Sequence, residues 1–200
     1  MKRIAVFDFD GTITRKDTLI AFIRFVKGSL GLYWGMFAHL PWLLLMKLRL
    51  CDNGKTKERV FGWFFRGMSI EQFNKLGQQF YEAQADNLLY ADAVQAIKEH
   101  NQKGDKVVVV SASIENWILP FASALQADGL LGTQAEVKNG RLTGKFSTKN
   151  CYGREKVERL KQWLQENGIK DSYVIAYGDS RGDKELLDFA NEKHYKSFKQ

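Results

Sequence analysis

Two carboxylates, Asp8 and Asp10, follow the apolar run of residues 4–7 close to the start of the chain. Side chains two residues apart on an extended segment point to the same side, so both carboxylates can face one pocket. Carboxylates that lie so close repel each other, and a hard cation with oxygen ligands would relieve this repulsion. Asp179 and Asp183 add negative charge after a later apolar run. Together these residues predict a Mg²⁺ site, which would also polarise and anchor a phosphate.

Short, continuous apolar runs predict the strands that position these residues. Residues 4–7, 106–110 and 173–177 are expected to be buried strands, and helical spacing predominates between them. We expect helices over residues 17–26, 55–65, 69–84, 91–103, 114–126, 153–165 and 182–189, a hairpin over residues 133–146 with Asn139 and Gly140 at its turn, and an edge strand over residues 194–198.

The alternation of strands and helices predicts an α/β fold, a Rossmann-like parallel sheet with helices on both faces. In such sheets, ligands bind beyond the carboxyl ends of the strands. Asp8, Ser111 and Asp179 each stand at such an end. We therefore expect these three residues to converge on one site.

One long segment interrupts the alternation of strands and helices. Residues 17–88 are helical in pattern and rich in aromatic residues, and no repeat or low-complexity tract appears in the chain. We expect this segment to form an all-helical cap domain. It would be inserted into an α/β core domain made of residues 1–16 and 89–200.

Within this segment, residues 28–46 contain no charged side chain and are long enough for a membrane span. Against a span, Gly35 and Pro41 interrupt the stretch, and a single crossing would separate Asp8 from Ser111. Three interpretations stay open: buried cap helices, contact with a membrane surface, and true spanning. Three flanking cations could meet anionic headgroups or be solvated helix ends: Lys27, Lys47 and Arg49.

The chain of 200 residues has a formal net charge of +7, which favours an acidic partner such as a phosphorylated metabolite or an anionic membrane surface. Its Lys and Arg residues are spread out and form no base-reading module, so we expect no nucleic-acid partner. Cys51 and Cys151 lie far apart, which argues against a zinc site and a disulfide framework. With no cleavable signal peptide recognisable, we expect a cytoplasmic protein, with peripheral contact at the inner membrane face as an alternative.

Four motifs resemble those of the haloacid dehalogenase-like superfamily, in order and in spacing, over the whole chain. They are Asp-Phe-Asp-Gly-Thr at residues 8–12, Ser111 after the valine run, Lys156 in a helix start, and Gly-Asp-Ser-Arg-Gly-Asp at residues 178–183. The helical insert between the first and second motifs is similar to subfamily IB. This is the branch that contains phosphoserine phosphatase and a bacterial phosphatidylglycerophosphate phosphatase.

The resemblance implies a Mg²⁺-dependent phosphatase. Asp8 would attack phosphorus and form an aspartyl-phosphate, and Asp10 would protonate the leaving oxygen and then deprotonate the hydrolytic water. Asp8, the Asp10 backbone carbonyl and the Asp179 carboxylate would provide the protein part of the Mg²⁺ shell. Asp183 would support that shell, directly or through the other ligands.

Phosphate-binding residues also follow from the resemblance. Ser111 and Lys156 would hold the phosphoryl oxygens, and the lysine would also neutralise charge on the nucleophile. Gly11, Thr12 and Ser113 would add further contacts with the phosphate. Three other cations compete for the role of Lys156: Lys149, Arg154 and Lys161.

Two substrate classes stay open, a soluble small-molecule phosphate and a phospholipid-like phosphate. Asp17 lies where the phosphoserine phosphatase pattern has an acidic amine-binding residue, but an N-cap role is at least as well supported. The aromatic cap argues against a small, very polar substrate. A phosphotransferase of the same fold and a non-enzymatic membrane-surface binding protein are the alternative functions.

Overall fold

A five-stranded sheet forms the centre of the computed structural model, which describes residues 1–48 and 50–198. The strand order is β3-β2-β1-β6-β7, and each neighbouring pair is parallel. The strands of this sheet are β1 (Lys2–Asp8), β2 (Lys106–Ile114), β3 (Gly129–Thr133), β6 (Ser172–Gly178) and β7 (Glu192–Tyr195). The predicted hairpin is confirmed as an antiparallel pair outside the sheet, β4 (Ala135–Lys138) and β5 (Arg141–Phe146).

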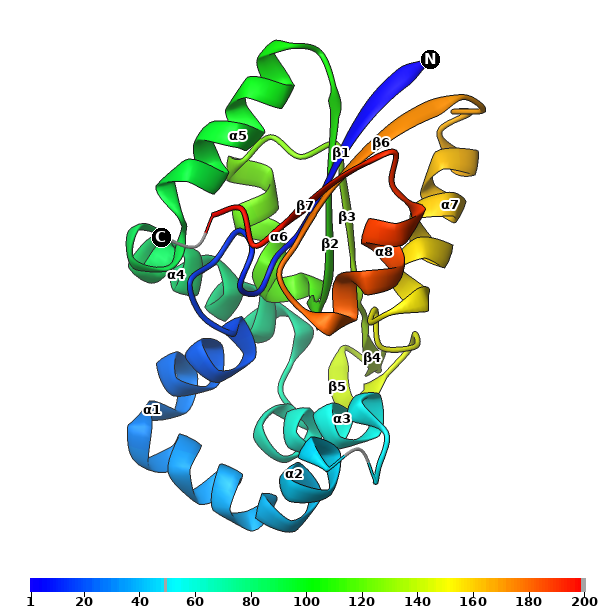
Figure 1. The fold of residues 1–200 in the computed structure, drawn as a ribbon. Helices are drawn as coiled ribbons and strands as arrows, with labels where there is room; N and C mark the ends of the chain where they lie inside the picture. The colour runs from blue at the N-terminus through cyan, green and yellow to red at the C-terminus, as the bar shows by residue number, and fades with distance from the viewer. Residues whose placement is uncertain (49, 199–200) are drawn as a thin grey trace.

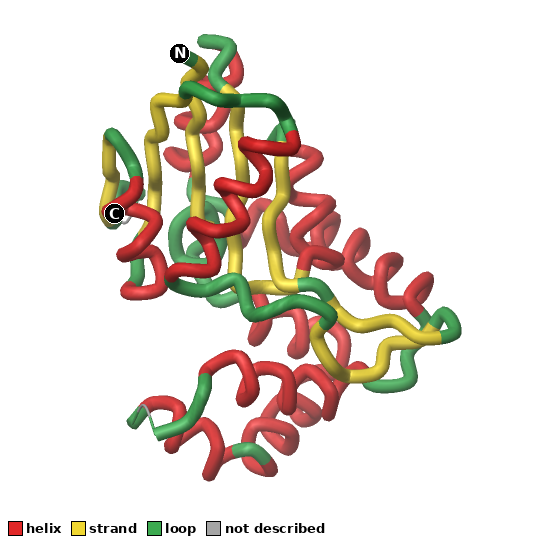
Figure 2. The backbone as a smooth tube through the Cα atoms, turned by 90° about the vertical axis from the view of Figure 1, so that its right-hand side faces the viewer, coloured by secondary structure: helices red, strands yellow, loops and turns green. Residues whose placement is uncertain are grey.

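Helices cover both faces of the sheet, with α5 and α6 on one face and α7 and α8 on the other (Figures 1 and 2). Successive residues of a strand point to opposite faces, so β1 contributes to two cores. Ala5 and Phe7 pack on the side of α5 and α6, whereas Ile4 and Val6 pack on the side of α7 and α8. The predicted α/β fold is thereby confirmed. These helices are α5 (Ala91–Gln102), α6 (Glu115–Ala124), α7 (Arg154–Glu166) and α8 (Lys184–Phe189), the last preceded by a single 3₁₀ turn, Arg181–Asp183.

Between β1 and α5 the chain forms four helices, α1 (Thr18–Ala38), α2 (Leu40–Lys47), α3 (Asn53–Phe65) and α4 (Ile70–Leu88). The first three lie beyond the carboxyl ends of the strands, and α4 returns to pack against α6 (Figure 1). The buried aromatic residues of this segment pack on one another and on Trp117 of α6. Phe22 of α1, for example, contacts four other rings: Phe65, Phe73, Phe80 and Trp117. We propose that residues 17–88 form the cap over the core, as the sequence predicts.

The first helix continues past residue 26, where the sequence predicts its end. Gly28, with φ of 72°, breaks α1, and helical backbone then resumes through Ala38. Glycine has no Cβ, so this left-handed conformation costs it little. The apolar stretch of residues 28–46 therefore forms the second arm of α1 and most of α2.

In the described part of the chain, no single helix has the length and apolarity of a membrane span. The pair of helices Thr18–Ala38 and Leu40–Met46 meets these criteria only together, and it is bent by 68°. Of the flanking cations, Arg49 and the side chain of Lys47 lie outside the described residues.

Two strands differ from the prediction. β3 has no counterpart there, because its sequence Gly-Leu-Leu-Gly-Thr is short and glycine-rich, and pairing with β2 is what makes it a strand. The predicted edge strand over residues 194–198 is wrong in its bounds. β7 starts at Glu192 and ends at Tyr195, since Lys196 adopts a positive φ of 57°.

Candidate active site

The carboxyl ends of β1, β2 and β6 bring the predicted site residues to one edge of the sheet. Asp8 ends β1, Ser111 lies in the last part of β2, and Asp179 directly follows β6. These strands are neighbours in the parallel sheet, so their ends adjoin. A cavity of about 450 Å³ opens here, and Asp8, Asp10 and Asp179 are among its lining residues.

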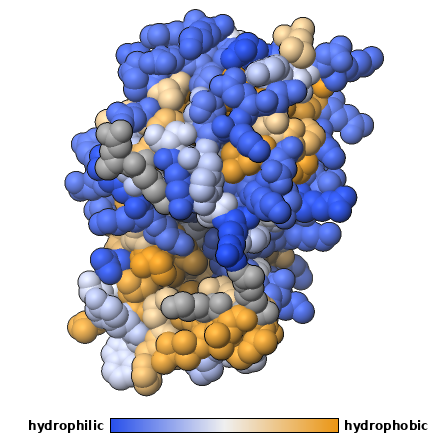
Figure 3. Space-filling view, in the orientation of Figure 1, coloured by the Kyte–Doolittle hydropathy of each residue, from blue (hydrophilic) through white to orange (hydrophobic). Residues whose placement is uncertain are grey.

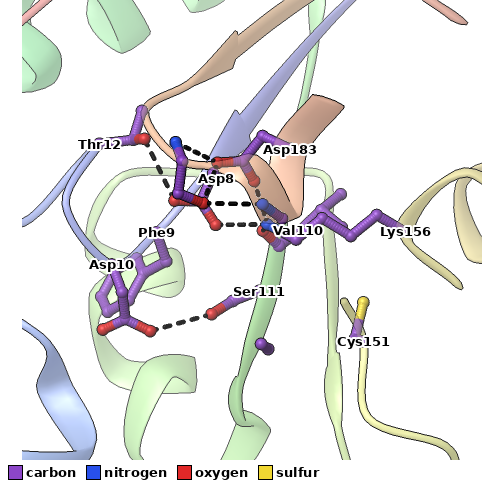
Figure 4. A network of polar contacts seen from close by, with 12 residues as sticks. Asp8, Phe9, Asp10, Thr12, Val110, Ser111, Cys151, Lys156 and Asp183 are labelled. Carbon is purple, nitrogen blue, oxygen red and sulfur yellow. Dashed lines mark hydrogen bonds and ion pairs between the residues drawn. The ribbon is translucent and has the colours of Figure 1, made fainter. Parts of the chain in front are cut away.

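Lys156 connects two carboxylates at this edge (Figure 4). Its Nζ donates to Asp8 Oδ1 at 2.5 Å and to Asp183 Oδ1 at 2.6 Å. All three side chains are buried, and the lysine reaches them from the first turn of α7. Arg154, one of the competing cations, pairs instead with Glu158 on the same helix.

Burial and ion pairing act in opposite directions on these groups. Burial raises the pKa of Asp8 to about 7, and the Lys156 ammonium counteracts part of that rise. Burial also disfavours the ammonium, but the carboxylates of Asp8 and Asp183 hold the pKa of Lys156 above its usual value. The pKa of Asp183 is lowered despite its burial, because Lys156 and Ser180 interact with its carboxylate. Lys156 therefore stays charged and favours the ionised form of its neighbours.

Asp183 also shapes the loop that follows β6. Its Oδ2 accepts hydrogen bonds from the backbone N of Asp179 at 3.1 Å, the backbone N of Ser180 at 2.9 Å and Ser180 Oγ at 2.8 Å. Asp183 thus binds Lys156 through one oxygen and holds the backbone of Asp179 through the other. The motif resemblance assigns no role to Ser180, which the structure places beside Asp183.

Three carboxylates lie close enough to share a metal ion. Asp8, Asp179 and Asp183 each offer one oxygen, and these oxygens lie within 4.8 Å of one another. The Lys156 ammonium is a single positive charge beside three carboxyl groups, so a divalent cation with oxygen ligands would compensate negative charge that the lysine does not. Gly11, with φ of 85°, makes room for this arrangement, because a Cβ there would lie 2.8 Å from Asp179 Oδ2. The donor set therefore fits Mg²⁺.

The Asp10 carboxylate is not among the three clustered carboxylates, and two other elements hold it. Its Oδ1 accepts from the backbone N of Thr18 at 2.7 Å and from the Thr18 hydroxyl at 2.5 Å. Its Oδ2 accepts from Ser113 Oγ at 2.5 Å and Ser111 Oγ at 3.3 Å. Trp117 Nε1 donates to the Thr18 hydroxyl at 3.2 Å. The start of α1 and the end of β2 thus orient Asp10 together.

The predicted phosphate-binding hydroxyls divide between the two aspartates. Thr12 Oγ1 donates to Asp8 Oδ2 at 3.1 Å, whereas Ser111 and Ser113 face Asp10. Contacts of these residues with a phosphate stay predictions.

The sequence motifs did not single out Thr18 or Trp117. Thr18 follows the predicted N-cap, Asp17, whose Oδ1 accepts from Leu19 N at 2.9 Å and Ile20 N at 3.2 Å. The N-cap interpretation of Asp17 is thereby confirmed. Burial and the nearby Asp10 carboxylate raise the pKa of Asp17. No sequence signal shows that α1 begins beside Asp10, so Thr18 could be found only from the structure.

The cavity has an apolar wall that α1, α2 and α3 supply. The wall also contains Lys57 of α3, whose Nζ donates to the backbone O of Ala112 at 2.9 Å. The cavity is therefore acidic at the strand ends and mostly apolar toward the helices, where Asn53, Thr56 and Lys57 of α3 are its polar residues. The apolar lining residues that these helices supply are Leu19, Ile20, Met36, Leu43, Met46 and Val60.

Comparison with known proteins gives a family match and a relative that each cover nearly the whole chain, and a further relative that covers about half of it. The model of the haloacid dehalogenase-like hydrolase family matches residues 5–188. Protein CicA of Caulobacter vibrioides is 36% identical over 197 residues, 98% of this chain and 86% of that protein. A phosphoserine phosphatase of Lactococcus lactis is 37% identical over 94 residues, which are 47% of this chain and 44% of that protein.

A solved structure of a Bordetella pertussis protein of unknown function has the same fold. It superposes with a TM-score of 0.85 at 22% identity, covering 96% of this chain and 89% of that one. The predicted superfamily and the prediction of an enzyme are confirmed by the family match. The chain belongs to the haloacid dehalogenase-like hydrolase family.

Proposed function

We propose that this hydrolase is a Mg²⁺-dependent phosphomonoesterase that acts through an aspartyl-phosphate on Asp8. The placement of Asp8 carries the proposal, since its carboxylate contacts Lys156 at 2.5 Å and belongs to the three-carboxylate cluster. A carboxylate held beside an ammonium and a cation site is arranged to attack phosphorus and to disperse phosphoryl charge. The relative named phosphoserine phosphatase supports the same reaction class.

In the first step, Asp8 forms a bond to phosphorus while the bond from phosphorus to the leaving oxygen breaks. Asp10 gives its proton to that oxygen. In the second step, water attacks phosphorus, Asp10 accepts its proton, and phosphate leaves Asp8. Thr18 and Ser113 keep Asp10 in position through both steps. Mg²⁺, held by the clustered carboxylates, would neutralise charge on the phosphoryl oxygens.

The cavity favours a phosphate ester whose alcohol has an apolar part. Six apolar side chains predominate on its helical side, and a polar group placed against them would lose hydration. Asp17 already uses a carboxylate oxygen to cap α1, which weighs against an amine-binding role. Among the open substrate classes, we favour a phospholipid-like phosphate or a small-molecule phosphate with an apolar group over phosphoserine.

The test is phosphate release from p-nitrophenyl phosphate, phosphoserine and a lipid-like monoester in detergent, with Mg²⁺ and with chelator. We expect release that the chelator abolishes. Asp8→Asn should lower kcat by about 10³-fold or more, because it removes the nucleophile. Acid-quenched wild-type protein should carry a phosphoryl group on Asp8. The matched control is Asp188→Asn on the exposed side of α8, which should keep wild-type activity.

Unchanged release by Asp8→Asn would exclude the covalent mechanism. Transfer of phosphate to an added alcohol, with none released to water, would instead show that the protein is a phosphotransferase.

A further inference from the structure

The second arm of α1 exposes an apolar stripe to solvent. Its members are spaced by three and four residues, so they lie on one face of the helix. The opposite face packs on the protein, where Leu32 and Gly35 are buried. A Cβ on Gly35 would lie 2.0 Å from the Phe64 ring, so this arm is packed tightly against α3. The stripe consists of Leu30, Tyr33, Trp34 and Phe37, with exposed fractions of 78%, 63%, 71% and 69%.

The short helix α2 extends this apolar surface across the bend. Figure 3 shows hydrophobic residues gathered at the end of the molecule that these helices form. Contiguous apolar patches of this kind are uncommon on a monomer without a binding role. We call the stripe and its extension the outer apolar face. The residues that α2 adds are Leu40, Trp42 and Leu44, with exposed fractions of 45%, 40% and 51%.

In the chain segment that carries the outer apolar face, the charged residues are of one sign, and Glu58 of α3 is an acidic residue that lies near this face, in a groove with Trp42 and Arg59. No Asp or Glu occurs between Asp17 and Asp52, whereas Arg24 and Lys27 are exposed on α1. The guanidinium of Arg59 lies 3.7 Å from the centre of the Trp42 ring, so a cation directly adjoins the apolar surface. A second copy docked through this face would bring the same cations together with no acidic partner in this segment. An anionic surface complements both the charge and the apolar side chains.

We propose that the outer apolar face docks on an anionic lipid bilayer, with the second arm of α1 and α2 lying in the interfacial region. Exposed Trp and Tyr side chains suit this region, because their rings are apolar and their N–H or O–H groups reach water or headgroups. The inner faces of the helices stay packed on the protein, so the helices lie on the bilayer and do not cross it.

Docking in this way also places the cavity next to the lipid. Met36, Leu43 and Met46 line the cavity and come from the two helices that carry the outer apolar face. If the cavity adjoins the lipid, the substrate class is phosphate esters that are held in the bilayer. This step rests on the proposed function. The docking itself rests on the exposed surface alone.

The experiment is flotation of the full chain with phosphatidylglycerol vesicles and with phosphatidylcholine vesicles, at low and high salt. We expect binding to phosphatidylglycerol at low salt that high salt weakens. Trp34→Ser combined with Phe37→Ser should lower the bound fraction by about tenfold, because it removes two large apolar anchors. Leu119→Ser is the matched control, since Leu119 is 55% exposed on α6, and it should bind as the wild type does.

Hydrolysis of p-nitrophenyl phosphate is measured on the same samples. Neither Trp34 nor Phe37 lines the cavity, so the double variant should keep wild-type activity toward this soluble ester. Absence of vesicle binding, or binding that the double variant retains, would overturn the proposal. If the wild type binds no vesicles and is a dimer, whereas the double variant is a monomer, the outer apolar face is instead an interface with a second copy of the chain. Vesicle binding without any hydrolysis would support docking and refute the proposed function.

Discussion

Asp10 has a different environment from Asp8, although the two are two residues apart. Asp8 is paired with the Lys156 ammonium, whereas the Asp10 carboxylate accepts hydrogen bonds from hydroxyl groups and a backbone N–H. The first arrangement suits a nucleophile, and the second suits a group that must give up and regain a proton. The Thr18 hydroxyl is central to the second arrangement, because it contacts both Asp10 and Trp117.

Thr18→Val should therefore impair acid catalysis while leaving the nucleophile in place. We expect kcat to fall by about tenfold for alkyl phosphates, which is a part of the roughly 10²–10⁴-fold contribution of a positioned general acid. The fall should be much smaller for p-nitrophenyl phosphate, whose leaving group needs little protonation. Steady-state kinetics on the two esters measure this difference, with Asp10→Asn as reference. An equal loss on both esters would show that Thr18 does not act through Asp10.

At the scale of elements, the start of α1 determines how the helices of residues 17–88 meet the sheet. Asp17 caps the helix, and the next residue, Thr18, contacts Asp10. Leu19 and Ile20 then enter the cavity wall. Burial and the Asp10 carboxylate raise the pKa of Asp17, so its ionised form is less favourable in the folded protein than in the unfolded chain. Its contribution to stability therefore falls as the pH rises through its folded-state pKa.

Asp17→Asn should keep the N-cap hydrogen bonds at the start of α1 and remove the unfavourable charge. We expect its melting temperature to equal or exceed that of the wild type, with the difference growing as the pH rises. Asp17→Ala should cost about 1 kcal/mol, or about 2–4 °C for a chain of this size. Thermal unfolding of the wild type and the two variants, measured between acidic and neutral pH, gives both differences in melting temperature. A raised KM for phosphoserine in Asp17→Asn, with other esters unaffected, would instead favour the amine-binding role.

At the scale of the whole molecule, two segments far apart in the chain supply the carboxylates of the proposed cation site, and a third supplies the ammonium beside them. Asp8 comes from β1, whereas Asp179 and Asp183 follow β6, and Lys156 comes from α7. The site thus exists only in the folded protein. A cation that binds the folded state alone must stabilise it.

Mg²⁺ should therefore raise the unfolding free energy by about 2.7 kcal/mol at a hundredfold excess over its Kd. Thermal unfolding with and without Mg²⁺ measures this effect independently of activity. Asp179→Asn should abolish most of the Mg²⁺-dependent shift, because it removes one carboxylate of the cluster. The exposed Asp188→Asn should retain it. A shift that survives in Asp179→Asn would place the cation elsewhere.

The sequence by itself determined three strands of the sheet, β1, β2 and β6, and the convergence of the residues at their carboxyl ends. Continuous apolar runs predict β1, β2 and β6, because strands buried on both faces need apolar side chains throughout. Residues at the ends of these strands then meet for topological reasons, as Asp8 and Asp179 do. The N-cap at Asp17 is a local interaction, and its sequence signal was sufficient.

Only the tertiary structure decided the rest. β3 depends on pairing with β2, and the contact of Thr18 with Asp10 depends on where α1 packs. The apolar residues 28–46 divide into an inner face on the protein and an outer face toward solvent. The physical reason is that long-range packing sets these features. A helix that is apolar on every side has no periodicity to show which face is buried.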